Sequence, residues 1–270
     1  MSKFVNISRY PYRNNLLLYL YRKLMIRLFK QYSFPKFSLA NELISHYKLS
    51  GMKEFLIRYY VSKMPFEKIW SCKERKIKKD FESFYKEYEG SVWRQAYQSA
   101  FEKSYKYKII YALDSIKKAK FDKESELLDY GCGAGAVASA LYKYGYKSIS
   151  VADIDSATLA FVKVAFKDRF KKIITIRGAR PLAKRYDVII AYDCLEHTFN
   201  PYGILRHLID SLNDKGLLII YYPKEMPKMT HTVVGQEQRE GCMKFLKETL
   251  VELDEEMLYT KKRYFGQLNT

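Results

Sequence analysis

Short apolar segments alternate with helix-like segments throughout the second half of this 270-residue chain. The apolar segments have the length of strands and are apolar on both faces. Strands of this kind, alternating with helices, are typical of an α/β fold, with a mostly parallel sheet and helices on both faces. The predicted strands are 126–130, 148–152, 173–176, 187–192 and 217–222, and the predicted helices are 134–144, 156–170 and 201–212.

The first half has a different composition and is predicted to form a helical, basic and aromatic extension over residues 1–120, followed by the α/β domain at 121–270. Residues 1–126 hold 27 basic and 13 acidic side chains, whereas residues 127–270 hold 21 and 17. This charge would suit an anionic metabolite, a nucleic acid or an anionic membrane, although a solvated basic face is the simpler interpretation. Helical patterns are predicted at 14–31, 39–49, 52–63, 66–89 and 91–120, with breaks at Pro65 and Gly90.

Composition also bears on location and on metal binding. The cysteines have neither the spacing of a disulfide framework nor that of a zinc site, so we expect no metal centre and a reducing, cytoplasmic setting. The most apolar N-terminal stretch, 16–29, contains three basic residues, which disfavours a membrane span, and no signal peptide is expected. The amphipathic pattern of 14–31 still allows peripheral contact with an anionic membrane. The four cysteines are Cys72, Cys132, Cys194 and Cys242.

A glycine-rich segment follows the first predicted strand and reads Asp-Tyr-Gly-Cys-Gly-Ala-Gly-Ala at 129–136. Glycines let the backbone turn sharply and approach a ligand closely, and the next helix points its free N–H groups at the same place. In parallel sheets, ligands bind at this end of the strands. The pattern of Gly131, Gly133 and Ala136 also fits dinucleotide binding, so NAD and adenosyl ligands both remain open at this point.

Two aspartates follow the second predicted strand. Asp153 stands where a carboxylate can accept hydrogen bonds from both hydroxyls of a ribose. Asp155, just before the next helical pattern, is interpreted as the N-cap of that helix.

Later segments complete a family pattern. The fourth predicted strand begins at Asp187 and is followed by Leu195-Glu196-His197, and Leu212 and Gly216 precede the fifth strand. Together with the glycine turn and Asp153, this order resembles class I S-adenosylmethionine-dependent methyltransferases of the small-molecule O-methyltransferase type. The resemblance covers about residues 125–223 and implies a Rossmann-like sheet with S-adenosyl-L-methionine as the cofactor.

The resemblance also assigns cofactor-binding residues. Asp153 would bind the ribose, and Ile154 would lie against the adenine. Family members often have an acid after the third strand, whereas this chain has Arg-Gly-Ala-Arg at 177–180, so the backbone of Gly178 and Ala179 is expected to contact the adenine. The methionine end would be shaped by Asp129, Gly131, Gly133 and Gly135.

The acceptor side is expected around the end of the fourth strand. The resemblance places Glu196 and His197 at the border of the acceptor site, and His197 is the candidate base because an imidazole titrates near neutrality. Asp193 would orient the acceptor or His197. Tyr222, at the end of the fifth predicted strand, and His231, in the loop that follows it, are candidate substrate contacts. Packing or loop-anchoring roles are the alternatives for these side chains.

The acceptor itself stays open. The leading hypothesis is O-methylation of a small metabolite or saccharide, and a phosphorylated or nucleotide-linked acceptor would suit the positive charge. Alternatives are methylation of RNA or another macromolecule that docks on the basic extension, a noncatalytic binding protein and an NAD oxidoreductase. The aromatic residues Trp93, Tyr97 and Tyr105 are expected in the core, with a lid as the alternative. Residues 236–270 are predicted to supply one helix and one short edge strand.

Overall fold

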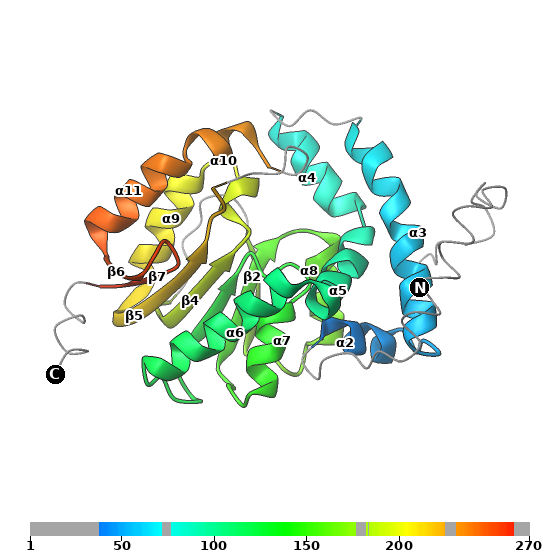
Figure 1. Cartoon of the computed structure of the whole chain (residues 1–270), viewed down its shortest axis with the longest axis horizontal. Coiled ribbons are helices and arrows are strands. Elements are labelled where there is room, and N and C mark those ends of the chain that lie inside the picture. Colours follow the sequence, from blue (N-terminus) through cyan, green and yellow to red (C-terminus); the bar gives the residue numbers. More distant parts are fainter. Residues whose placement is uncertain (1–37, 72–76, 177–181, 183, 225–230, 262–270) are drawn as a thin grey trace.

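The computed structural model describes residues 38–71, 77–176, 182, 184–224 and 231–261 (Figure 1). The predicted helix at 14–31, its proposed membrane contact, and the adenine contacts predicted for Gly178 and Ala179 lie outside these ranges. Within the described part, no helix combines the length and apolar character that crossing a bilayer requires.

A seven-stranded sheet forms the centre of the molecule, with the strand order β3-β2-β1-β4-β5-β7-β6. The first five strands are parallel, and β7 is antiparallel to both of its neighbours. This arrangement confirms the predicted α/β fold. The order reverses between β1 and β4, where a doubly wound sheet binds its ligands. The strands are β1 (Leu127–Tyr130), β2 (Ile149–Ile154), β3 (Lys172–Ile176), β4 (Tyr186–Tyr192), β5 (Leu212–Tyr221), β6 (Val251–Asp254) and β7 (Leu258–Thr260).

Neighbouring residues of each central strand point to opposite faces of the sheet, and both faces are covered. In β1, Leu127 belongs to one buried cluster and Leu128 to the other. The first cluster includes residues of α7 (Ala136–Lys143) and α8 (Ala157–Ala165), and the second includes residues of α9 (Pro201–Asp210) and α11 (Arg239–Thr249). The view in Figure 1 shows α9 and α11 on one side of the strands and α6 and α7 on the other.

The N-terminal helices share the core of the sheet. Ala96 and Ala100 from α5 and Ile109 and Ala112 from α6 are buried in the same cluster as Leu127. In the described residues, the helices of the predicted extension and the α/β part therefore share one hydrophobic core. Its helices are α2 (Leu39–His46), α3 (Met52–Ser71), α4 (Lys78–Glu87), α5 (Gly90–Phe101) and α6 (Lys103–Lys118).

Several helix boundaries differ from the predictions, and the helix predicted at 66–89 is interrupted at Ile77, whose backbone is extended before α4 begins. Pro65 does not end a helix, because α3 runs through it to Ser71. A proline removes one backbone donor, and the burial of Phe55 and Leu56 earlier in α3 stabilises the helix against that loss. The helix predicted at 91–120 is interrupted at Glu102, whose backbone is extended at φ −84° and ψ 123°. Neither glycine nor proline marks this break in the sequence.

The C-terminal region differs as well. The prediction of one helix and one edge strand is wrong: α10 (Val233–Glu237) precedes α11, and β6 and β7 form an antiparallel hairpin that pairs with β5. These strands have only four and three residues, which is too short for an alternating pattern to stand out. Glu256, in the hairpin turn, has a positive φ of 53°, so the turn lacks the glycine that usually signals it.

Candidate functional site

The glycine turn joins β1 to α7 at the switch point of the sheet. Gly131, Gly133 and Gly135 have φ angles of 71°, 53° and 81°, a region that favours glycine. A Cβ atom on Gly131 would overlap the Cβ of Cys194 and lie 3.3 Å from its Sγ atom. The first glycine is therefore required both by its backbone angles and by the closeness of the chain after β4.

Asp129 lies near the end of β1, just before the glycine turn. The side chain is buried, and Oδ2 accepts a hydrogen bond of 3.1 Å from the backbone N–H of Ala138 in the first turn of α7. Burial raises the pKa of Asp129 to about 7, against the lowering effect of this hydrogen bond. Asp129 thus holds the start of α7 in place and shapes the cofactor turn from below.

Asp153 bridges the end of β2 and the glycine turn. Its Oδ2 atom accepts a 2.6 Å hydrogen bond from the N–H of Gly133, and Oδ1 accepts a 2.7 Å bond from the N–H of Ile154. Burial raises its pKa to about 6, although both backbone bonds favour the ionised form. The predicted ribose-binding acid is therefore held next to the turn by the backbone on both sides.

The N-cap predicted for Asp155 is wrong. Helix α8 begins one residue later than predicted, and Ser156 caps it with its hydroxyl, which accepts a hydrogen bond from the N–H of Leu159. Asp155 is exposed and lies 3.9 Å from the Nζ atom of Lys86 on α4.

Asp193 follows β4 directly and has the positive φ of 49°, which is uncommon for a residue other than glycine. Lys108 of α6 donates hydrogen bonds to both of its carboxylate oxygens, at 2.7 and 2.5 Å. The lysine side chain is 13% exposed, and its Nζ atom also lies 4.2 Å from the centroid of the Tyr221 ring. Sequence reasoning missed Lys108, because it is one of many lysines in a helical segment.

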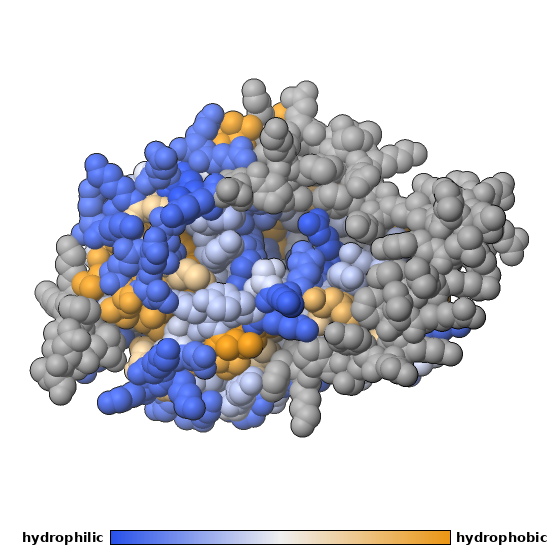
Figure 2. Space-filling view, in the orientation of Figure 1, coloured by the Kyte–Doolittle hydropathy of each residue, from blue (hydrophilic) through white to orange (hydrophobic). Residues whose placement is uncertain are grey.

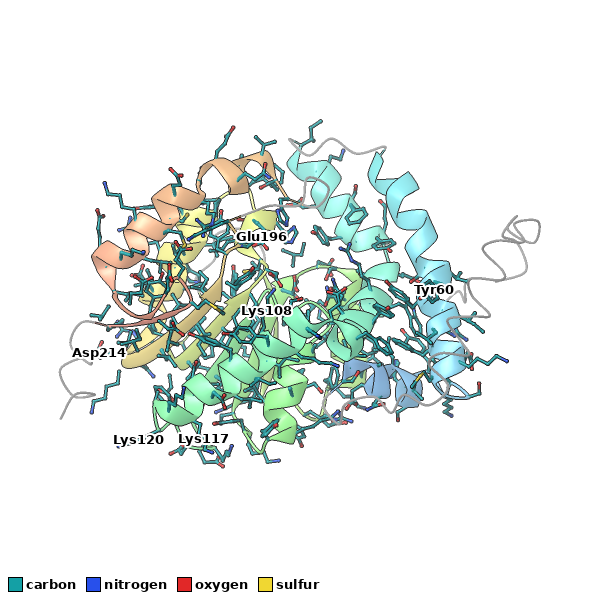
Figure 3. The ribbon with its side chains drawn as sticks, in the orientation of Figure 1. Tyr60, Lys108, Lys117, Lys120, Glu196 and Asp214 are labelled. Carbon is teal, nitrogen blue, oxygen red and sulfur yellow. The ribbon has the colours of Figure 1, made fainter. Side chains whose placement is uncertain are left out.

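Figure 3 shows Lys108 and Glu196 near the middle of the molecule, whereas Lys117, close to the other end of α6, lies at the edge of the molecule. Glu196 is 1% exposed and stands in the short 3-10 helix Leu195–His197, between β4 and α9. Burial and, to a lesser extent, the neighbouring Asp193 raise the pKa of Glu196 to about 8. This carboxyl group is therefore mainly protonated at neutral pH.

His197 is surrounded by three side chains from separate parts of the chain. Its Nδ1 atom lies 3.2 Å from the hydroxyl of Tyr85 on α4, and its Nε2 atom lies 3.9 Å from Oε1 of Glu196. The ring of His231 packs edge-on against it, with the centroids 4.9 Å apart. The structure thus brings together the predicted residues Glu196, His197 and His231 and adds Tyr85, whose place could not be read from the sequence.

This group also has the composition of a metal-ligand set. One ligand atom from each of Glu196, His197 and His231 lies within 4.8 Å of the others. Spacing in the sequence does not reveal the set, because His231 comes from a distant loop. Carboxylate and imidazole ligands together suit a divalent ion such as Zn²⁺.

The remaining predicted site residues have other surroundings. Tyr222 is buried, and its hydroxyl donates a hydrogen bond to the carbonyl oxygen of Gly235, which anchors the loop after β5. Ile154 remains at the end of β2, beside Asp153. Tyr97 stacks on Tyr59 of α3 with ring centroids 3.9 Å apart, and Trp93 packs against Phe55. These contacts give both aromatic side chains packing roles.

Tyr105 differs from the other two aromatic residues predicted to be core or lid. Burial, with the nearby carboxylates of Asp193 and Asp129, raises its pKa well above the usual range. Tyr105 itself is half-buried and packs against the same buried cluster as Leu127.

A hollow of about 660 Å³ lies elsewhere, over α11. Its lining includes Arg239 and Lys224, and both form ion pairs with Glu256. Hydrophilic residues cover this side of the molecule (Figure 2). None of the predicted site residues that the structure describes lines this hollow.

Three carboxyl groups with raised pKa values lead to a prediction about stability. Asp129, Asp153 and Glu196 retain protons in the folded protein at pH values where the unfolded chain has lost them. Because the folded state then binds more protons, we expect the free energy of unfolding to fall as pH rises from about 4.5 to 8. Each group contributes up to about 1.4 kcal/mol per pH unit.

Urea denaturation of the cofactor-free protein at pH 5.5 and pH 8 measures this fall. The variant Glu196→Gln should flatten the upper part of the curve, because it removes the carboxyl with the highest of the three pKa values. A free energy of unfolding that increases from pH 5.5 to 8 would contradict the assignment.

The described residues fit S-adenosylmethionine. Three left-handed glycines form the turn at the switch point, and the Asp153 carboxylate stands beside it, bonded to the N–H of Gly133. Across the switch point, Asp193, Glu196 and His197 follow the end of β4. The cofactor supplies an electrophilic methyl group on a sulfonium, and the protein has to bind it and orient the acceptor.

Comparisons with known proteins agree with this arrangement. The chain matches the model of a protein family described as "Methyltransferase domain" over residues 97–256. The ubiquinone biosynthesis O-methyltransferase of Rickettsia bellii (strain OSU 85-389) is 27% identical over 113 residues, which are 41% of this chain and 47% of that protein. The protein of the same name from Rickettsia prowazekii (strain Madrid E) is 27% identical over 118 residues, or 42% and 46%.

The chain therefore spans about half the length of the curated relatives that it matches. Among solved structures, CalS10, an amino pentose methyltransferase from Micromonospora echinaspora with S-adenosylmethionine bound, is 20% identical. Its TM-score is 0.42, over 51% of this chain and 58% of that one. Because the family model covers more than half of the chain, the chain belongs to the methyltransferase-domain family.

Proposed function

We propose that this enzyme methylates a hydroxyl group of a small metabolite or saccharide, with His197 as the base. The observation that carries the proposal is the position of His197: it follows β4 beside the cofactor turn, and its Nδ1 atom already holds a hydroxyl group, that of Tyr85, at 3.2 Å. An acceptor hydroxyl in a similar position could transfer its proton to the imidazole. The name of the Rickettsia relatives, ubiquinone biosynthesis O-methyltransferase, supports oxygen as the acceptor atom.

The charges at this edge favour an uncharged acceptor. In the described residues, the carboxyl groups of Asp153 and Asp193 border the site, the mainly protonated Glu196 adds no positive charge, and Lys108 is engaged by Asp193 through both oxygens. A phosphate group would have to approach these carboxyl groups. We therefore favour a sugar hydroxyl or a phenol over the phosphorylated acceptor that the positive charge of the chain suggests.

Labelled cofactor identifies the acceptor class. The enzyme is incubated with methyl-labelled S-adenosylmethionine and a cell extract, which is then separated into small molecules, nucleic acid and protein. Label in the small molecules, lost with Asp153→Ala, is the expected result. Label in RNA or protein would overturn the small-molecule acceptor and would assign a docking role to the basic N-terminal region.

Replacing His197 tests the base. We expect His197→Ala to lower kcat about 10²- to 10⁴-fold, the usual contribution of a general base, while S-adenosylhomocysteine binds as before. His46→Ala is a matched control, since His46 is exposed on α2, away from the site. Unchanged turnover in His197→Ala would remove the base assignment.

A chelator distinguishes a base from a metal ligand in the same experiment. If His197 acts as the base alone, wild-type activity should survive treatment with EDTA. Activity that EDTA abolishes and a divalent ion restores would assign Glu196, His197 and His231 to a metal ion instead.

A further inference from the structure

The side chain of Gln95 lies in the glycine turn, although it comes from the N-terminal helix α5. Its Oε1 atom accepts a 2.7 Å hydrogen bond from the backbone N–H of Ala134. A Cβ atom on Gly133 would lie only 2.7 Å from Nε2 and 2.8 Å from Cδ of Gln95. The amide group therefore packs against Gly133, at a distance that only glycine permits.

This contact fixes which way the amide faces. Ala134 offers an N–H donor, so the oxygen of Gln95 must face it, and the NH₂ group is presented on the other side. The neighbouring N–H of Gly133 is already bonded to Asp153. Two successive backbone donors of the turn are thus occupied by side chains, and among the described residues the Nε2 atom of Gln95 has no acceptor within the protein.

With the ribose at Asp153 and the methyl group near His197, as the family resemblance implies, the methionine part of the cofactor would lie over this turn. The chain of atoms beyond the sulfonium ends in a carboxylate, which is the only anionic group of the cofactor. Lys108, the buried cation of α6, is held by both oxygens of Asp193.

We propose that Gln95 recognises the cofactor's carboxylate: Nε2 donates a hydrogen bond to it while Oε1 holds the turn through Ala134. Gln95 is then a positioning residue that makes α5 part of the cofactor site. The inference rests on the cofactor and on neither the acceptor nor the base proposed above, so binding alone tests it.

The test compares two ligands that differ in the methionine part. S-adenosylhomocysteine carries the carboxylate, whereas 5′-methylthioadenosine keeps the adenine, ribose and sulfur and lacks it. In Gln95→Glu, an oxygen can still accept from Ala134, but the donor is replaced by negative charge. We expect this variant to bind S-adenosylhomocysteine about 10- to 100-fold more weakly by calorimetry, with methylthioadenosine affinity changed less than about twofold.

Gln98→Glu is the matched control, because it makes the same change on the same helix, and both affinities should stay at the wild-type value. Gln95→Met, which has similar length and no donor, repeats the test without added charge. Equal weakening of both ligands would assign Gln95 a purely structural role and overturn the proposal, as would unchanged S-adenosylhomocysteine binding.

The result also separates this proposal from the proposed function. A wild-type protein that binds neither ligand would overturn the cofactor assignment and the role of Gln95 together. Selective loss of S-adenosylhomocysteine binding in Gln95→Glu would support the role of Gln95 even if no hydroxyl acceptor were ever methylated.

Discussion

Asp153→Ala is expected to weaken binding of S-adenosylhomocysteine by at least about 100-fold. The carboxylate would accept hydrogen bonds from two ribose hydroxyls, and a hydrogen bond to a charged group contributes about 1.5–3 kcal/mol. The same substitution removes the acceptor of the N–H of Gly133, so the glycine turn also loses one of its supports. Both effects act on affinity in the same direction, and calorimetric titration measures their sum.

Asp155→Ala is the control for this experiment. Asp155 carries the same charge two residues further on, but it is exposed and its contact is a distant ion pair with Lys86, which contributes little to stability or binding. The affinity of the Asp155→Ala variant for S-adenosylhomocysteine should remain within about twofold of wild type. Equal losses in the two variants would mean that general negative charge, rather than the position of Asp153, determines affinity.

Gly131→Ala is expected to disrupt the cofactor site and to destabilise the fold by about 2–5 kcal/mol. A left-handed backbone costs an L-residue about 1–2 kcal/mol, and forcing a methyl group into a packed contact adds about 1–3 kcal/mol. The new methyl group would overlap Cys194 at the start of the chain segment that carries the acceptor residues. We expect a lower denaturation midpoint together with weaker cofactor binding.

Two further variants separate the clash from the backbone strain. Gly145→Ala places alanine at a φ of 98°, but its Cβ would meet only the flexible side chain of Lys123, at 3.8 Å. It should show the strain without the clash and without a change in binding. The double variant Gly131→Ala with Cys194→Gly removes the overlapping atoms and should recover part of the lost affinity; no recovery would contradict the clash.

Much of the α/β part could be predicted from the sequence, because its signals are local. The first strand was predicted at 126–130 and is observed at Leu127–Tyr130, and the positive φ angles of the turn coincide with its glycines. Local sequence signals do not predict an element correctly where tertiary packing determines its structure. The helix through Pro65 is an example, because its apolar residues are buried on one side of the proline.

Sequence reasoning finds only part of the candidate site. Its sheet-derived residues, such as Asp153 and His197, follow strands and are found by position. Gln95, Lys108 and Tyr85 come from helices of the first half, and their contacts exist only after those helices pack across the ends of the strands. A polar residue in an amphipathic helix carries no mark of such a contact in a single sequence.

The core that the N-terminal helices share with the sheet has a consequence for how this enzyme can be divided or recombined. The family model begins at residue 97, in the middle of α5, whereas Ala96 and the residues packed around it belong to the same buried cluster as β1 and β4. The segment that matches the family model is thus shorter than the segment that shares one hydrophobic core. A truncation at the homology boundary would expose an apolar face of the sheet, and a chimera made to change acceptor preference would have to carry α5 and α6 along with the strands they cover.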